Sequence, residues 1–128
     1  MPEGTEEAAR SIAGGEHEAV PFYRRALAAS QKLPEEDLAG TYLGLGSTYR
    51  VLGEYEDSRR VLREGVKRFP ADRALSTFLA LTLYNLGECR EATSTLLKNL
   101  VETTNDPGIR LYGRALAHYA DRLDETLE

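Results

Sequence analysis

Apolar residues recur every three to four positions along most of the chain, and almost no segment alternates with the two-residue period of a strand. The clearest case is 54–69, where Tyr55, Leu62, Gly65 and Phe69 are predicted on one buried helical face. Arginine and lysine side chains occupy the opposite face of this segment. The pattern predicts an all-α protein.

Glycine and proline divide the chain into seven predicted helices, at 5–13, 18–31, 34–53, 54–69, 72–86, 88–103 and 107 to about 125. Pro21 is tolerable only within the first turn of its helix, where a missing N–H costs nothing. Gly53 and Pro70 are expected to end helices, and Asp106 with Pro107 to begin one. The short loops predict antiparallel helical hairpins.

The chain resembles itself at a shift of 34 residues, which places Leu45 on Leu79, Gly53 on Gly87 and Leu62 on Leu96. At a shift of 70 residues, Tyr42 and Tyr49 fall on Tyr112 and Tyr119. A helix-turn-helix period of 34 residues is typical of the tetratricopeptide repeat. The sequence resembles that family over nearly its whole length.

The residues that carry the resemblance are clearest in 39–72. Tyr42-x-x-Leu45-Gly46-x-x-Tyr49 looks like the first helix of a repeat, called helix A. The second helix, helix B, and the turn after it are matched by Ser58, Leu62, Gly65 and Pro70. Two further segments, "TFLALTLYNLGECREA" and "RLYGRALAHYADRL", also resemble small stand-alone bacterial proteins of this family.

The resemblance implies one domain over 1–128, an α-α superhelix of antiparallel helix pairs. Its parts would be a degenerate repeat at 5–38, two repeats at 39–72 and 73–106, and a C-terminal capping helix at 107–128. It also explains two glycines inside helices. Gly46 would let helix A approach helix B of the same repeat, and Gly65 would face the next repeat.

Composition favours a soluble, cytoplasmic protein of one domain. The chain has 128 residues, of which 41% are hydrophobic and 29% charged, and it contains no apolar run long enough to span a bilayer. The N-terminus lacks the apolar segment of a secretory signal, and Cys89 has no second cysteine with which to form a disulfide. The net charge of −5 argues against nucleic acid as the main ligand.

The chemical motifs favour a protein without catalysis, cofactor or metal. Gly44-Leu45-Gly46 has Tyr49 where a dinucleotide site needs its third glycine. His17 and His118 stand apart from any group of metal ligands, and surface positions are expected for both. We interpret Cys89 as a small buried residue rather than a nucleophile.

The resemblance implies that the A helices line a concave groove that receives ligands. The positions carried over are Gly40, Leu43, Ser47, Arg50, Val51, Ala74, Thr77, Leu81, Tyr84, Asn85, Arg110, Gly113, Arg114, Ala117 and Ala120. Some family members hold a peptide carboxylate with two basic residues, and Arg110 and Arg114 match these in position. Leu43, Ser47 and Phe78 stand where the remaining clamp residues would be, so the full clamp is absent.

The resulting hypothesis is a non-enzymatic protein–protein interaction module that binds a peptide or helix of a partner protein in an apolar groove with arginines at its rim. The alternative is self-association, in which a second copy covers the groove as a homodimer. A regulatory subunit that senses a small peptide is a third possibility. The basic face of 54–69 is interpreted as a solvated outer surface rather than a patch for an acidic partner.

Overall fold

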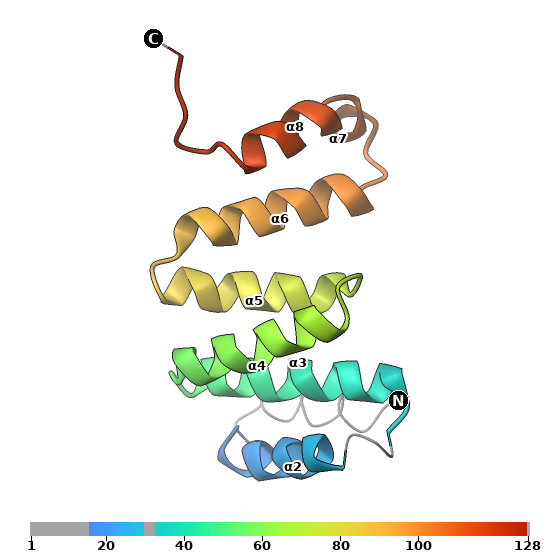
Figure 1. Ribbon diagram of the computed structural model, residues 1–128, viewed down its shortest axis with the longest axis vertical. Helices are drawn as coiled ribbons and strands as arrows, with labels where there is room; N and C mark the ends of the chain where they lie inside the picture. Colours follow the sequence, from blue (N-terminus) through green and yellow to red (C-terminus); the bar gives the residue numbers. More distant parts are fainter. Residues whose placement is uncertain (1–15, 30–32, 128) are drawn as a thin grey trace.

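The computed structural model describes residues 16–29 and 33–127, and within this part of the chain every regular element is a helix. The helices are α2 (Glu16–Ala28), α3 (Glu35–Val51), α4 (Tyr55–Arg68), α5 (Arg73–Asn85), α6 (Cys89–Thr103), α7 (Pro107–Leu111) and α8 (Gly113–Ala120). They stack one on the next from α2 to α8, with α3 behind α4 (Figure 1). The all-α prediction is confirmed. The expected helix at 5–13 lies outside the described residues.

Two identical turns close the hairpins α3/α4 and α5/α6. Gly53 and Gly87 have φ values of +79° and +80°, the left-handed conformation that favours glycine. In each turn the glycine N–H donates to the backbone carbonyl three residues back. The N–H of the next residue donates to the backbone carbonyl of Tyr49 in the first turn and of Leu83 in the second, at 2.8 Å in both. This is the Schellman arrangement, which satisfies carbonyls at the end of a helix. The prediction that Gly53 ends a helix is confirmed.

Gly46 and Gly65 allow close contact inside the first hairpin. A Cβ atom at Gly46 would lie 2.3 Å from Cγ of Leu62, a residue with no exposed surface. A Cβ atom at Gly65 would lie 2.9 Å from Cβ of Tyr42 and 3.1 Å from Leu75 of α5. The prediction for Gly46 is confirmed. Gly65 faces the next repeat as expected, and it also faces its own helix A.

The core runs continuously along the stack from α2 to α6. A chain of polar groups within it joins three helices: the Ser58 hydroxyl donates to the Gly46 carbonyl at 2.7 Å and lies 2.8 Å from the Thr82 hydroxyl. Both hydroxyl-bearing residues are fully buried. Because buried polar groups are costly without partners, this arrangement fixes the relative position of α3, α4 and α5.

Helix α2 packs on α3 through Tyr23, which is fully buried. A Cβ atom at Gly44 would lie 2.2 Å from the Tyr23 ring, so this glycine makes room for the aromatic side chain. The Tyr49 hydroxyl accepts a hydrogen bond from Arg24 Nε at 2.8 Å. Pro21 was expected in the first turn of this helix, but α2 begins at Glu16 and Pro21 is its sixth residue. The helix therefore lacks one backbone hydrogen bond near its start.

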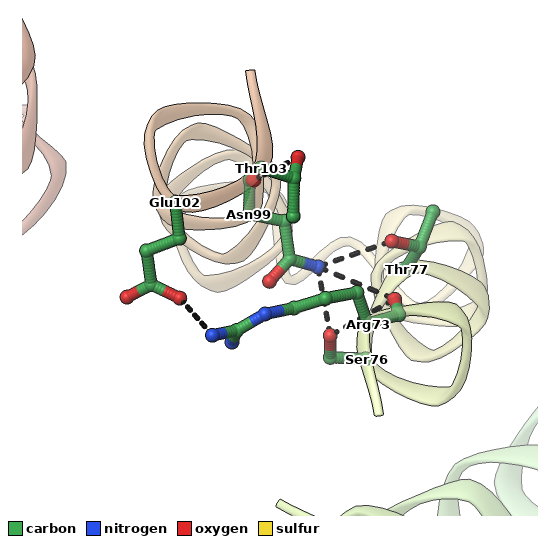
Figure 2. Close-up of polar contacts among 6 residues, drawn as sticks. All are labelled: Arg73, Ser76, Thr77, Asn99, Glu102 and Thr103. Carbon is green, nitrogen blue, oxygen red and sulfur yellow. Dashed lines mark hydrogen bonds and ion pairs between the residues drawn. The ribbon is translucent and has the colours of Figure 1, made fainter. Parts of the chain in front are cut away.

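The second hairpin is held by Asn99 of α6. Its side-chain nitrogen donates to Ser76 Oγ at 2.7 Å and to Thr77 Oγ1 at 3.0 Å, both on α5 (Figure 2). Arg73, one turn away, forms an ion pair with Glu102 at 2.5 Å. A polar clamp thus joins α5 to α6.

The C-terminal helix differs from its prediction. Asp106 caps it as expected, its carboxylate accepting from the Ile109 N–H at 3.0 Å, and Pro107 is its first residue. The helix is divided at Tyr112 into α7 and α8, and it ends at Ala120 rather than near 125. The following segment is held against α6 instead, because Lys98 donates to Asp121 at 2.6 Å and Arg90 pairs with Asp124.

Candidate functional site

The predicted groove residues of α3 and α5 meet at the C-terminal ends of these two helices. Arg50 Nε donates to Asn85 Oδ1 at 2.7 Å. Both side chains are half-buried, and they belong to successive A helices. The structure therefore brings two sequence-predicted site residues into direct contact and ties the two inner helices together.

Three exposed apolar side chains are close in sequence to Arg50 or to Asn85. Val51 exposes 51% of its surface, Leu81 38% and Tyr84 67%. Leu43 and Ser47 are half-buried, with Leu43 packed against the core and the Ser47 hydroxyl bonded to the Gly44 carbonyl of its own helix. Among the predicted groove residues of α3 and α5, the exposed apolar surface thus lies toward the C-terminal half of α5 and at the end of α3.

Thr77 is engaged inside its own hairpin. Its hydroxyl accepts the hydrogen bond from Asn99 and points toward α6 (Figure 2). Of the predicted residues on α5, Leu81 and Tyr84 present apolar surface to solvent, whereas Thr77 has a hydrogen-bond partner already.

The cap contributes two exposed arginines, Arg110 on α7 and Arg114 on α8. Neither forms an ion pair within the described residues. Two other cap residues require a correction. Gly113 and Ala120 were carried over as groove positions, but both are buried. A Cβ atom at Gly113 would touch Val101, so this side of α8 is its packing face against α6.

Three arginines on the basic face of α4 pair with neighbouring carboxylates. Arg59 pairs with Glu56, and Arg60 lies 3.4 Å from Asp57. Arg63 donates two hydrogen bonds of 2.8 Å to Glu91 of α6, which lowers the pKa of Glu91 and raises that of Arg63. These contacts agree with the interpretation of this face as a solvated outer surface.

Cys89 was interpreted as buried, and this was wrong. It is the first residue of α6 and is exposed. The first turn of α6 is exposed through Glu91, and Ala92 is its first buried residue. The thiol borders a surface hollow of about 510 Å³ beside Arg90 and Asp124.

Neither a metal site nor a membrane span is found in the part of the chain that the structure describes. No three residues of the metal-binding types gather within reach of one ion there. In the same ranges, none of the helices combines the length and apolarity that crossing a bilayer requires.

Sequence reasoning missed one surface, the outward face of α7 and α8. Leu111, Tyr112 and Tyr119 expose 75%, 63% and 58% of their surfaces. A signal for this was present in the sequence. Tyr112 and Tyr119 correspond to Tyr42 and Tyr49, and no further helix B was predicted after them to cover them.

Comparison with known proteins agrees with this architecture. A family model described as tetratrico peptide repeat matches residues 5–123, and the chain belongs to this family. No curated protein matches the sequence.

Proposed function

We propose that this tetratricopeptide repeat protein is a non-enzymatic module that holds an extended or helical segment of a partner protein across α3 and α5. The observation that carries the proposal is the exposed apolar surface of Leu81, Tyr84 and Val51. The opposite sides of the same helices are fully buried, with Leu45, Leu79 and their neighbours in the core. These apolar side chains are exposed on an otherwise well-packed stack. Covering them with a partner protein removes apolar surface from water and so stabilises the complex.

The arginines on the cap and at the end of α3 favour an acidic partner or a free C-terminal carboxylate. Arg110 and Arg114 are exposed and have no internal acidic partner among the described residues. Arg50 is held by Asn85 and leaves its terminal guanidinium nitrogens free of any other side-chain bond in these ranges. Charges at the rim of an interface select the partner and speed its approach.

A single unpaired cysteine agrees with a reducing compartment such as the cytoplasm.

The proposal is tested with Leu81→Glu. We expect this variant to lose partner capture, because the complex would bury an unpaired carboxylate at a cost of several kcal/mol. The free protein should keep its fold, since Leu81 is already 38% exposed. Leu96→Glu is the matched control, because Leu96 is 41% exposed but lies on α6, a B helix. The measurement is affinity capture from the native host, with a thermal melt of each variant.

Two outcomes would overturn the proposal. If Leu81→Glu unfolds the protein while Leu96→Glu does not, Leu81 belongs to the core. If both variants fold and capture the same partners, binding takes place on another face. Arg114→Glu refines the test, since loss of a rim charge should weaken capture more at low salt than at high salt.

Self-association through the same apolar surface is the alternative function. It predicts that Leu81→Glu converts a dimer to a monomer in solution, whereas the proposed module keeps its oligomeric state in this variant. A mass measurement on the variant therefore separates the two functions.

A further inference from the structure

Arg50 is fixed in place by an amide rather than by a carboxylate. Other arginines in the described part of the chain form ion pairs, among them Arg63 with Glu91. For Arg50 the side-chain partner in the same ranges is Asn85, whose Oδ1 atom accepts from Nε at 2.7 Å. An amide carries no charge. Asn85 therefore holds the guanidinium in position without neutralising it.

The contact leaves hydrogen-bond donors free on both side chains. A guanidinium only donates, so the amide atom that faces it is Oδ1, and Nδ2 stands beside it on the same group. Neither Nη1 and Nη2 of Arg50 nor Nδ2 of Asn85 has a further bond to the described residues. Both side chains are half-buried. A positive charge that is partly removed from water is stabilised when an opposite charge is placed against it.

The acidic groups closest along the chain do not supply that charge. Glu54 and Glu88 follow the two helices, and neither forms an ion pair with Arg50 within the described residues. The backbone carbonyl of Arg50 itself accepts from the Gly53 N–H in the turn. The counter-charge of this guanidinium must therefore come from outside the described chain.

We propose that Arg50 and Asn85 together bind the side-chain carboxylate of an aspartate or glutamate in the partner segment. This inference rests on the function proposed above, and it names the residues that select the segment. The edge formed by Nη1 and Nη2 matches the two oxygens of a carboxylate, and Nδ2 supplies a further donor. A carboxylate can satisfy these donors and the charge at once, whereas a neutral amide or hydroxyl satisfies only the donors.

The neighbours of the pair show why the carboxylate belongs to a side chain. Val51 and Tyr84 are the adjacent residues in sequence, and they expose 51% and 67% of their surfaces, whereas Arg50 and Asn85 are half-buried. Apolar residues of the segment can cover Val51 and Tyr84 while an acidic side chain reaches down to the pair. A terminal carboxylate would have to bring its own backbone to the same depth. The expected partner segment therefore has an acidic residue flanked by apolar ones.

The probes are two pools of short synthetic peptides with blocked termini. Apolar residues flank one glutamate in the first pool and one glutamine in the second. We expect the immobilised protein to retain about tenfold more of the glutamate pool, because hydrogen bonds to a charged group are stronger than neutral ones. A third pool, with glutamine and a free C-terminus, tests the terminal carboxylate and should be retained no better than the second.

Asn85→Asp separates binding from the tie between α3 and α5. The aspartate still accepts from Arg50, so the melting temperature should be kept or raised. It also neutralises the guanidinium and removes the Nδ2 donor, and we expect the preference for glutamate peptides to disappear. Asn105→Asp is the matched control, because it makes the same change at an exposed position between α6 and α7 and should keep the preference.

The anchor and the apolar surface fail in different ways. Equal retention of the first two pools, lost in Leu81→Glu, would leave the apolar surface standing and overturn the acidic anchor. An unchanged glutamate preference in Asn85→Asp, or stronger retention of the free-terminus pool, would also overturn it. A glutamate preference that persists in Leu81→Glu but disappears in Asn85→Asp would support the anchor and contradict the apolar surface. Retention of no pool would overturn both.

Discussion

The hairpins α3/α4 and α5/α6 close with the same turn and yet hold their helices together by different means. Position by position, Tyr42 and Gly65 of the first correspond to Ser76 and Asn99 of the second. In α3/α4 an aromatic side chain packs directly over a glycine. In α5/α6 a hydroxyl accepts a hydrogen bond of 2.7 Å from an amide (Figure 2).

This difference shows that the fold requires the filled space between the helices rather than particular residues. In α3/α4 the large side chain of Tyr42 faces a glycine, which has no side chain. In α5/α6 the small side chain of Ser76 faces the larger one of Asn99. Close packing tolerates such paired exchanges, provided that the total volume is kept and each polar group has a partner.

The largest effect is expected when the asparagine of α6 is placed at the corresponding position of α4 while Tyr42 is kept. Gly65→Asn should lower the free energy of unfolding by about 3 kcal/mol, because its Cβ atom alone would lie 2.9 Å from that of Tyr42. Urea denaturation measures this change. Gly40→Asn is the matched control on α3, where nothing lies within 4 Å of an added Cβ atom, and it should be near neutral.

The same experiment sharpens the comparison when Tyr42→Ser is added to Gly65→Asn. If the serine–asparagine pair of the second hairpin can replace the tyrosine–glycine pair of the first, the double variant should be more stable than the sum of the two single changes implies. Strictly additive effects would show that the two residues do not compensate for each other in volume.

A smaller effect is expected in the second hairpin. Asn99→Ala should lower stability by about 1–2 kcal/mol, because it removes the hydrogen bonds to Ser76 and Thr77 and leaves a gap. Thermal denaturation of this variant is compared with Ser76→Ala, which removes one acceptor and should cost less. An Asn99→Ala variant as stable as the unmodified protein would show that the polar clamp contributes nothing to this hairpin.

The smallest effect concerns the contact between hairpins, the ion pair of Arg63 with Glu91. Because the pKa of Glu91 is below its ordinary value of 4.5, the pair adds stability above that pH and loses it as the pH falls through the lowered pKa. Both side chains are nearly half exposed, so solvent reduces the effect to a few tenths of a kcal/mol. Glu91→Gln should be slightly less stable at neutral pH and equal to the unmodified protein in acid. A difference that persists in acid would show that the charge of Glu91 is not its source.

Much of the fold was predictable because its determinants are local in the sequence. Gly53 and the Asp106–Pro107 pair are boundary signals in themselves, and the resemblance to the tetratricopeptide repeat placed Gly46 against helix B. The end of the last helix was not predictable in this way. Its apolar spacing continues to Leu123, but ion pairs from Lys98 and Arg90 hold the following residues on α6.

The candidate site was less accessible to sequence reasoning, because exposure depends on which helices are neighbours in space. Asn99 looks like a surface residue on an amphipathic helix, and its partners are known only from the folded hairpin. Cys89 occupies a position that is usually apolar, yet it is exposed in the first turn of α6. Tyr112 and Tyr119 match core tyrosines by period, and only the stack shows that they are uncovered.

The order of helix contacts has a consequence for how the molecule opens. Apart from the pairings of α3 with α5 and of α6 with α8, the main contacts join helices that are neighbours along the described chain. Such a stack behaves as a linear array, in which each layer is stabilised only by the layers beside it. Opening can therefore start at α8 and advance layer by layer toward α3 without a single global transition. Amide hydrogen exchange should reveal this as a gradient of protection, lowest in α7 and α8 and highest in α3 and α5, each of which contacts three other helices.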